Sequence, residues 1–437
     1  MIGFLIFFCQ NVSSVKKTMN RVKKIIAILL LLAGSAHAQF KQPWLIDARH
    51  IKVDSLLWDL NELSKAPQSR WLDDTSAVRS LLYKSVDFEG KPTEVFAYYS
   101  NPDIIAGRPA TNQKFPGLVL IHGGGGKAFR EWVEKWANEG YAAIAMDLSG
   151  NGADGQKVEQ PGPDQSNENK FQKIEKGNLK NVWTYHAVAS SILAHSLLLS
   201  FPEIDPLRTG VTGISWGGYL TCLVASLDSR FIAAAPVYGC GFYDESDVFK
   251  QSLNALSPAA KTRWMKFFDP SAYLPYSKPL MFFINGNKDK HYNVGPYIKT
   301  YELSKNKQIC IIPDMPHSHK DGWAPIEMRT FFDGALNGNP RPFVAFSTIT
   351  LDNNQLTVML KTVAGKQVAS AEFYYTNDIT SNNEHRVWQH SPATINEDTQ
   401  TIVQPVPKEG YKYAFFYLKD TDGVSGTTVF LKDGKVN

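Results

Sequence analysis

The sequence is poor in cysteine. Its 437 residues include four, and only Cys222, Cys240 and Cys310 follow residue 38. An odd number of cysteines, scattered through apolar or glycine-rich surroundings, does not indicate a disulfide framework, so we expect buried free thiols. An excess of either charge is also lacking. The chain has 46 Lys and Arg against 42 Asp and Glu, and the first 38 residues hold five of the basic and none of the acidic ones, which leaves 41 against 42. This balance favours neither a nucleic acid nor an anionic membrane surface as a partner.

A long apolar run is also missing near the start of the chain. The run from Ile25 to Ala33 is too short to cross a bilayer. It follows the basic stretch 21–24 and precedes small residues at Ala36 and Ala38, which is the pattern of a secretory signal peptide. We therefore predict a signal peptide over residues 1–38 that is cleaved after Ala38, a secreted or periplasmic protein, and no membrane span after cleavage. The alternative is a membrane anchor, because residues 1–18 contain a second apolar stretch.

Between residues 78 and 337, fully apolar strands such as "FPGLVLI" and "AAIAM" alternate with amphipathic helices such as "REWVEKWANEGY". This alternation predicts an α/β domain with a mostly parallel sheet that helices cover on both faces. Residues 39–77, with a helical stretch around "VDSLLWDLNEL" and a Trp-containing loop, are predicted to be an extension that packs on this core. Two polar or mixed segments, Gly150–Lys180 and Phe242–Pro275, interrupt the alternation, and we expect them to form rims or lids.

The periodicity changes after the Gly/Pro-rich linker Asn337–Pro342. Short strands with alternating apolar and polar residues follow, for example "QLTVMLKTV" and "YKYAFFYLKD". This pattern predicts an all-β sandwich of the Ig or fibronectin type over residues 343–437. The linker leads us to expect that this domain forms its own core and supplies no catalytic group.

A single serine stands between two glycines in Gly213-Ile214-Ser215-Trp216-Gly217. The motif G-x-S-x-G is weak when taken alone. Here, however, it joins an apolar strand to a helix, where a strained turn can expose the serine hydroxyl above the sheet edge. We therefore predict that Ser215 is a nucleophile.

Serine needs a base and an orienting acid, and in this fold they follow it in the order Ser, acid, His. Asp289 comes after the strand "PLMFFING", and His317 and His319 follow the strand "QICIIPD". We predict Asp289 as the acid and His317, which comes sooner after its strand, as the base. His319 is the alternative base or a substrate contact.

The tetrahedral intermediate of acyl transfer also needs donors for its oxyanion. The backbone N–H of Trp216 is freed at the start of a helix, and the run "HGGGG" at residues 122–126 can turn its amides inward. We predict that Trp216, Gly124 and Gly125 supply the oxyanion hole. A metal site that combines the two histidines with His291 and Asp314 is a weaker alternative, because nothing else completes a ligand set. We predict no metal and no cofactor.

The segments "HGGGGKAFREWVEKWANEGYAAIAMDLSG", "GVTGISWGGYLTC", "INGNKD" and "MPHSHKDGWAPIE" together resemble the α/β-hydrolase superfamily, in particular its acetyl xylan esterase/dienelactone hydrolase-like branch. The resemblance covers about residues 83–336 and implies Ser215 as nucleophile, Asp289 as acid and His317 as base. The long insertion and the added β-domain depart from simpler relatives.

These observations predict a secreted serine carboxylester hydrolase that works through an acyl-enzyme and deacetylates a carbohydrate. Its substrate is a small-molecule or glycan ester, and aromatic residues at Trp183, Trp264 and Trp323 are expected on the rim. The alternative is a prolyl-oligopeptidase-type peptidase, which the short region of about 75 residues before the core disfavours. A binding protein with a lapsed site is disfavoured by the intact Ser, Asp and His. The pattern makes no prediction of oligomeric state.

Overall fold

A sheet of nine strands forms the centre of the described part of the chain, which comprises residues 45–53, 55–338, 345–361 and 367–434 of a computed structural model. The predicted signal peptide and residues 339–342 of the predicted linker lie outside the described residues. The strands are β1 Ser69–Asp73, β2 Arg79–Phe88, β3 Lys91–Ser100, β4 Phe115–Ile121, β5 Ala142–Met146, β6 Ile204–Ile214, β7 Ala233–Val237, β8 Leu280–Gly286 and β9 Lys307–Ile312.

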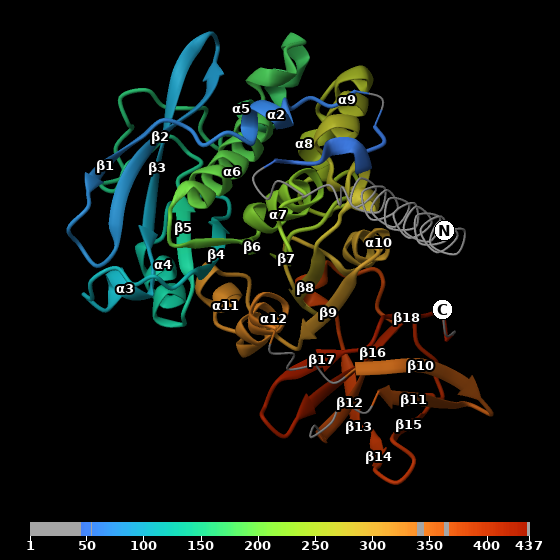
Figure 1. Cartoon of the computed structure of the whole chain (residues 1–437). Helices are drawn as coiled ribbons and strands as arrows, with labels where there is room; N and C mark the ends of the chain where they lie inside the picture. Colours follow the sequence, from blue (N-terminus) through green and yellow to red (C-terminus); the bar gives the residue numbers. More distant parts are fainter. Residues whose placement is uncertain (1–44, 54, 339–344, 362–366, 435–437) are drawn as a thin grey trace, which may run out of the picture. The chain divides into compact units, whose positions relative to one another are not determined.

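The sheet order is β1-β2-β3-β5-β4-β6-β7-β8-β9 (Figure 1). Strands β1, β2 and β3 form antiparallel pairs, β3 pairs antiparallel with β5, and all pairs from β5 to β9 are parallel. Every residue of β4, β5 and β7 is buried, as a strand covered on both faces requires. The predicted mostly parallel α/β sheet is confirmed, and it is consistent with an α/β-hydrolase fold. The carboxyl ends of β4, β6, β8 and β9 therefore meet at one edge, where the predicted site residues follow them.

Helices cover both faces of the sheet. The long helix α6 and helix α7 lie on one face, and α4 and α12 lie on the other (Figure 1). No helix in the described part of the chain is both long and apolar enough to cross a membrane. The helices are α2 Leu60–Leu63, α3 Pro102–Ile105, α4 Arg130–Asn138, α5 Asn167–Lys170, α6 Trp183–Ser200, α7 Trp216–Leu227, α8 Lys250–Asn254, α9 Pro258–Phe268, α10 Val294–Leu303, α11 His319–Trp323 and α12 Ile326–Asn337, and the 3₁₀ turns are η1 Ala48–His50, η2 Gln172–Lys176, η3 Leu179–Asn181, η4 Pro270–Ala272, η5 Leu274–Tyr276 and η6 Asn383–His385.

Two local expectations need correction, and one of the predicted rim segments contains a helix. The helix expected around "VDSLLWDLNEL" is only α2, because the Asp59 carboxylate caps the N–H groups of Asn61 and Glu62 and so begins the helix there. The expected Trp-containing loop is the edge strand β1. The segment Phe242–Pro275 contains the 11-residue helix α9, which begins with Ser257 as its cap and a proline in its first turn. Cys222, Cys240 and Cys310 are buried free thiols, as expected.

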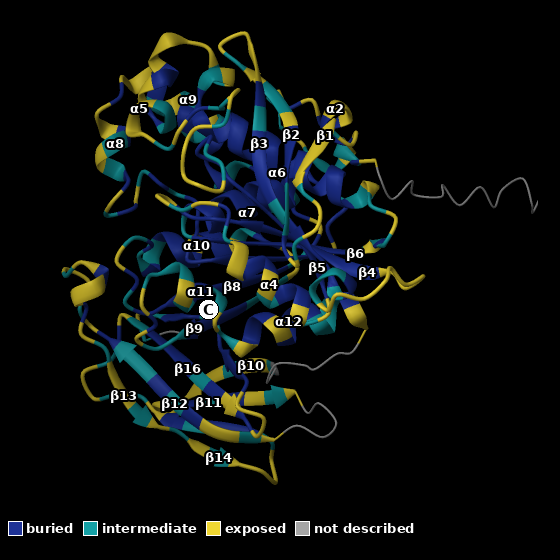
Figure 2. Cartoon of the chain, turned by 90° about the vertical axis from the view of Figure 1, so that its left-hand side faces the viewer, coloured by how far each residue is buried: buried dark blue, intermediate teal, exposed yellow. Residues whose placement is uncertain are grey.

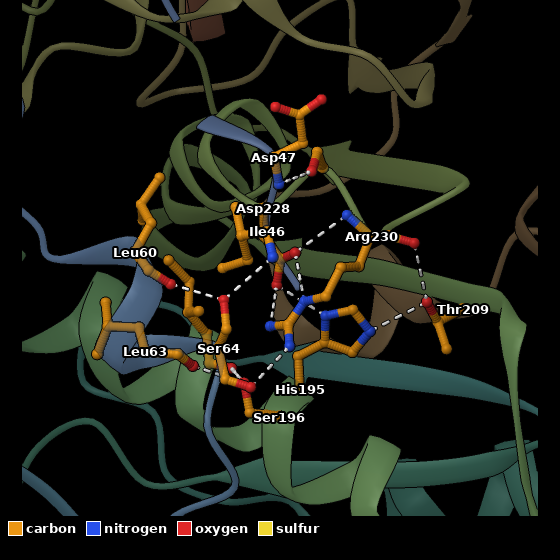
Figure 3. A network of polar contacts seen from close by, with 12 residues as sticks. Ile46, Asp47, Leu60, Leu63, Ser64, His195, Ser196, Thr209, Asp228 and Arg230 are labelled. Carbon is orange, nitrogen blue, oxygen red and sulfur yellow. Dashed lines mark hydrogen bonds and ion pairs between the residues drawn. The ribbon is translucent and has the colours of Figure 1, made fainter. Parts of the chain in front are cut away.

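A buried polar network ties the segment before β1 to the core (Figure 3). His195 Nδ1 contacts Asp228 Oδ2 at 2.8 Å and its Nε2 contacts Thr209 Oγ1 at 3.0 Å. Arg230 donates to Asp228 and also to the carbonyl of Ser64. Although burial opposes it, the Arg230 guanidinium holds the pKa of Asp228 well below its ordinary value. A histidine–aspartate pair of this kind, fully enclosed and far from solvent, is a structural link between α6, β6 and the N-terminal extension.

The C-terminal residues form two antiparallel sheets, one in the order β10-β11-β15-β14 and one in the order β13-β12-β16-β17, with β18 beside β16. Side chains of both sheets, among them Leu356 and Phe416, share one apolar core, so the sheets pack face to face. Figure 2 shows a mixture of buried, intermediate and exposed positions along these strands, and in β11 buried residues alternate with less buried ones. The Ig or fibronectin type stays a prediction. The bounds are β10 Ala345–Asp352, β11 Gln355–Lys361, β12 Val368–Thr376, β13 Gln389–Pro392, β14 Thr394–Asn396, β15 Thr401–Pro405, β16 Tyr413–Asp420, β17 Ser425–Thr427 and β18 Leu431–Lys432.

This C-terminal domain also contacts the hydrolase core directly. Phe415 and Phe430 belong to the apolar cluster of the large sheet. The Thr427 hydroxyl of β17 accepts a hydrogen bond from Ile311 N–H at 3.1 Å and donates to the carbonyl of Ile309 at 3.2 Å, so β17 covers the outer edge of β9. The described residues from 45 to 434 accordingly lie in one compact unit. The predicted boundaries at residues 77, 337 and 343 stay predictions.

Candidate active site

Ser215 lies at the turn between β6 and α7 with the backbone angles φ 61° and ψ −117°. A positive φ is costly for a residue other than glycine, and such strain is found where the surrounding structure imposes it at functional sites. The neighbouring Gly217 permits the turn, because a Cβ there would lie 2.0 Å from the carbonyl oxygen of Ile121. The strand and helix therefore pack closely, and Ser215 remains partly exposed between buried neighbours.

Asp289 lies in the loop that follows β8, and its side chain is buried. Its Oδ1 accepts hydrogen bonds from the backbone N–H groups of His291 and Tyr292, both at 2.7 Å. Two backbone donors stabilise a buried carboxylate and leave it one oxygen free to face another group. That second oxygen, Oδ2, contacts His317.

His317 connects the two other side chains. Its Nδ1 lies 2.6 Å from Asp289 Oδ2 and its Nε2 lies 3.0 Å from Ser215 Oγ. The ring is held between those of Tyr238 and His291, with centroids 4.4 and 4.5 Å away. Since a carboxylate only accepts, Nδ1 is the donor in its contact with Asp289, and Nε2 is the ring nitrogen placed to accept the Ser215 proton. The three residues that the sequence predicts as nucleophile, acid and base thus form one hydrogen-bonded chain.

His319 makes a different contact. Its Nε2 accepts a hydrogen bond from Gly123 N–H at 2.9 Å, and its ring lies 4.7 Å from that of Phe129. It therefore bonds the glycine loop instead of Ser215 or Asp289. Burial, with the nearby charges of His122 and His317, lowers the pKa of His319 to about 4.

The other histidines of this region are also held by protein groups. His122 Nδ1 contacts the carbonyl of Gly123 at 2.7 Å, and its Nε2 accepts from Leu148 N–H at 2.9 Å. Asp314, which the weaker metal hypothesis includes, pairs with Lys288 Nζ at 2.9 Å. Within the described ranges, no group of three His, Cys, Asp or Glu side chains is placed to hold a metal ion.

The backbone N–H groups of the glycine loop, residues 123–126, differ in their hydrogen-bond partners. Gly125 N–H donates to Gln165 Oε1 at 2.9 Å, and Gly123 N–H is taken by His319. Among the residues that the structure describes, the N–H groups of Gly124 and Trp216 have no protein acceptor. A Cβ on Gly124 would lie 2.7 Å from Trp216 Cδ1, so these two residues are neighbours. The Gln165 side chain occupies the amide of Gly125, whose role as an oxyanion donor stays a prediction, whereas the N–H groups of the other two predicted donors, Gly124 and Trp216, have no acceptor among the described residues. Gln165 lies in the polar insertion and carried no sequence signal.

Aromatic side chains enclose Trp216, the residue after Ser215. The rings of Tyr219, Tyr243 and Phe249 lie 5.2 to 5.3 Å from it, and Lys170 Nζ lies 4.5 Å from its ring centroid. Burial lowers the pKa of Lys170 to about 8. The Tyr292 hydroxyl contacts that of Tyr243 at 3.0 Å. Burial raises the pKa of Tyr292 well above the usual range.

Two of the expected rim tryptophans are core residues. Trp183 and Trp264 are fully buried, and their indole N–H groups donate to the carbonyls of Leu148 and Lys170. Only Trp323 is partly exposed. The rim assignment of Trp183 and Trp264 is corrected, since an apolar ring fills a core as well as it binds a sugar and sequence does not separate the two.

Comparison with known proteins identifies a family that part of this chain matches. Residues 103–266 match the family model described as "Dienelactone hydrolase family", a range that includes the glycine loop and Ser215 and ends before Asp289 and His317. No curated protein sequence matches the chain.

Solved structures of similar fold include two esterases and a peptidase. The acetyl xylan esterase from Paenibacillus sp. R4 is 19% identical, with 62% of this chain and 88% of that chain covered and a TM-score of 0.49. Acetyl xylan esterase 1 from Thermoanaerobacterium sp. JW/SL YS485 is 18% identical, with 61% and 88% covered and a TM-score of 0.48. The acylaminoacyl peptidase of Pyrococcus horikoshii is 18% identical, with 64% and 43% covered and a TM-score of 0.45.

The family match covers the glycine loop and the strand–serine–helix turn. His317, which contacts Ser215, and Asp289, which contacts His317, lie beyond the matched residues. The predicted resemblance to the dienelactone hydrolase-like branch is confirmed by the match over residues 103–266. The chain carries a domain of the Dienelactone hydrolase family, within the α/β-hydrolase superfamily, and is a serine hydrolase.

Proposed function

We propose that this protein is a secreted carboxylester hydrolase that removes small acyl groups, acetate above all, from a carbohydrate. The observation that carries the proposal is the chain Ser215–His317–Asp289, with contacts of 3.0 and 2.6 Å. In this proposal Ser215 is the nucleophile, His317 the general base and Asp289 the acid that orients the base. The signal-peptide pattern over residues 1–38 supports secretion or a periplasmic location.

Acylation follows from these contacts. Ser215 Oγ attacks the ester carbonyl while its proton passes to His317 Nε2, and the imidazolium that results is stabilised by the Asp289 carboxylate. In this proposal the negative charge on the carbonyl oxygen is met by the N–H groups of Gly124 and Trp216, which have no acceptor among the described residues. The bond to the alcohol oxygen then breaks, and His317 returns the proton to that oxygen, which releases the alcohol.

Deacylation repeats the same steps with water. His317 Nε2 takes a proton from water, whose oxygen attacks the acyl-enzyme carbonyl, and the returning proton releases Ser215 and the free acid. Large buried rings lie near the nucleophile: the rings of Tyr238 and Tyr292 lie 4.4 and 6.0 Å from that of His317, and the buried Trp216 follows Ser215 in the chain. This crowding supports a small acyl group.

A substrate panel tests the proposal. We expect turnover of 4-nitrophenyl acetate to exceed that of the butyrate and octanoate esters, acetate release from acetylated xylo-oligosaccharides, and no turnover of dipeptide anilides. Ser215→Ala should abolish all ester turnover while the circular dichroism spectrum is retained. Preference for the anilides would instead support the prolyl-oligopeptidase-type alternative. N-terminal sequencing of protein recovered outside the cytoplasm should give Gln39 as first residue.

A further inference from the structure

The C-terminal β-domain reaches the loop that carries Asp289 through one side chain. Asn383, in the turn η6 between β12 and β13, is only 2% exposed. Its Nδ2 donates to the carbonyl of Asp289 at 2.9 Å and to that of Asn287 at 3.3 Å. Its Oδ1 accepts from Val294 N–H at 3.4 Å. One amide from the β-domain therefore bonds the loop on both sides of Asp289.

These bonds use the hydrogen-bonding capacity of the amide fully. A primary amide has two N–H donors and one oxygen that accepts twice. Both donors meet loop carbonyls, and the second acceptor position takes Arg386 Nη1 at 2.8 Å. Arg386 is itself 7% exposed, and its guanidinium lies 5.9 Å from the ring of Tyr413 on β16. Arg386 thus fixes the rotamer of Asn383 from within the β-domain.

The bonded backbone positions the carboxylate. Asp289 Oδ1 is held by two N–H groups of its own loop, so the direction of Oδ2 depends on the path of residues 287–294. Buried carbonyls that lose their donors seek other partners, and the loop would shift to provide them. A shift of about 1 Å at a positioning group is sufficient to lower a rate about 100-fold.

We propose that Asn383 is a positioning residue for the acid of the triad, so that the C-terminal domain completes the active site. The inference rests on the proposed function, since it needs Asp289 to orient His317. Asn383 does not touch the substrate, and it acts through the backbone of the Asp289 loop.

Asn383→Asp is the decisive variant, because the aspartate keeps an acceptor for Val294 N–H and Arg386 and loses both donors to the loop carbonyls. We expect kcat for 4-nitrophenyl acetate to fall about 10- to 100-fold with KM unchanged. We also expect the acid limb of the kcat/KM profile to move, because the carboxylate that faces His317 is displaced. His291, Tyr238 and Tyr292 also face His317 and are untouched by the variant.

The matched control is Asn382→Ala, an exposed neighbour whose side chain does not cap η6. It should retain wild-type kcat and pH profile. Every rate is divided by the fraction of enzyme that a fluorophosphonate labels, so that loss of folded protein does not enter kcat. Arg386→Gln is the second variant. This variant keeps both N–H donors of Asn383 but no longer fixes the Asn383 rotamer. We expect a smaller fall in kcat and a smaller shift of the pH profile than in Asn383→Asp.

Normalised kcat within twofold of wild type in Asn383→Asp would overturn the proposal. So would a fall that comes only from fewer labelled molecules, with an unmoved pH profile, since that is a folding role. If Asn383→Asp gives no soluble protein, Arg386→Gln decides by the same two criteria. Failure of the proposed function itself looks different, because wild-type protein would then show no Ser215-dependent labelling at all.

Discussion

His319 accepts a hydrogen bond from Gly123 N–H at 2.9 Å, two residues beyond the imidazole that faces Ser215. A backbone N–H only donates, so His319 Nε2 carries no proton in this contact. Its pKa of about 4, lowered first by burial, keeps the ring neutral near pH 7. The two histidines of "HSH" thus bond two different elements. His317 bonds Ser215, and His319 bonds the glycine loop, in which the Gly124 N–H has no acceptor among the described residues.

His319→Phe should lower kcat for an aryl acetate about 10- to 100-fold, because the ring still fills the space beside Phe129 while Gly123 N–H loses its acceptor and the oxyanion loop loosens. His319→Gln offers an amide oxygen near the position of Nε2 and should recover part of the loss. Steady-state kinetics at pH 7 measures both. Equal activity of the wild type and the phenylalanine variant would mean that the loop holds its shape without His319.

The sequence predicts the nucleophile, acid and base because each follows an apolar strand, and the carboxyl ends of parallel strands meet at one edge. Helix α9 also had a local signal, with Ser257 as a cap and apolar residues at 260, 264 and 268. Gln165 and Asn383 had none. Gln165 meets the glycine loop across 40 residues and Asn383 meets Asp289 across 94, and a polar contact of that range leaves no periodicity in the chain. The same holds for Trp183 and Trp264, whose burial depends on tertiary packing.

Asp289→Asn should lower kcat on the order of 10⁴-fold, because the amide can present N–H to His317 and favour the wrong tautomer. Asp314→Asn is the control. Asp314 is exposed on the turn before His317 and pairs with Lys288, and its positive φ suits asparagine. The control should stay within about twofold of wild type, as for most surface substitutions. An Asp289→Asn enzyme with more than a tenth of wild-type kcat would remove Asp289 from the triad.

The enclosed His195 should make stability depend on pH. Burial lowers its pKa to about 4, whereas a histidine of the unfolded chain titrates near 6.5. The folded state therefore binds this proton less readily than the unfolded state. Its contribution is complete above pH 6.5 and is lost as the pH falls toward 4, by on the order of 3 kcal/mol. Urea unfolding at several pH values between 4 and 7.5 measures this loss.

His195→Gln cannot titrate, so we expect the slope of unfolding free energy against pH to decrease by up to one proton in this range, although the variant is less stable at pH 7. His385→Gln serves as the control, because its imidazole is 73% exposed. The control should leave the slope unchanged. A slope that is the same in wild type and His195→Gln would show that His195 does not titrate between the two states.

The contact between β17 and β9 should couple the unfolding of the C-terminal domain to that of the hydrolase core. Thr427→Val removes the hydroxyl that bonds Ile311 N–H and the Ile309 carbonyl, and it leaves two buried backbone groups without partners, which costs about 1–3 kcal/mol. Since the described residues from 45 to 434 lie in one compact unit, we expect a single calorimetric transition that moves as a whole to lower temperature. Thr428→Val is the comparison, because the Thr428 hydroxyl bonds Phe416 N–H inside the β-domain.

Two separate transitions, with only the β-domain transition moved by either variant, would mean that the domain unfolds independently, as the linker Asn337–Pro342 alone predicts. In that case a protein shortened after residue 338 would keep its ester activity. A single transition instead predicts that the shortened protein is not a stable enzyme. The shortening would expose the edge of β9 and the apolar residues that contact Phe415 and Phe430.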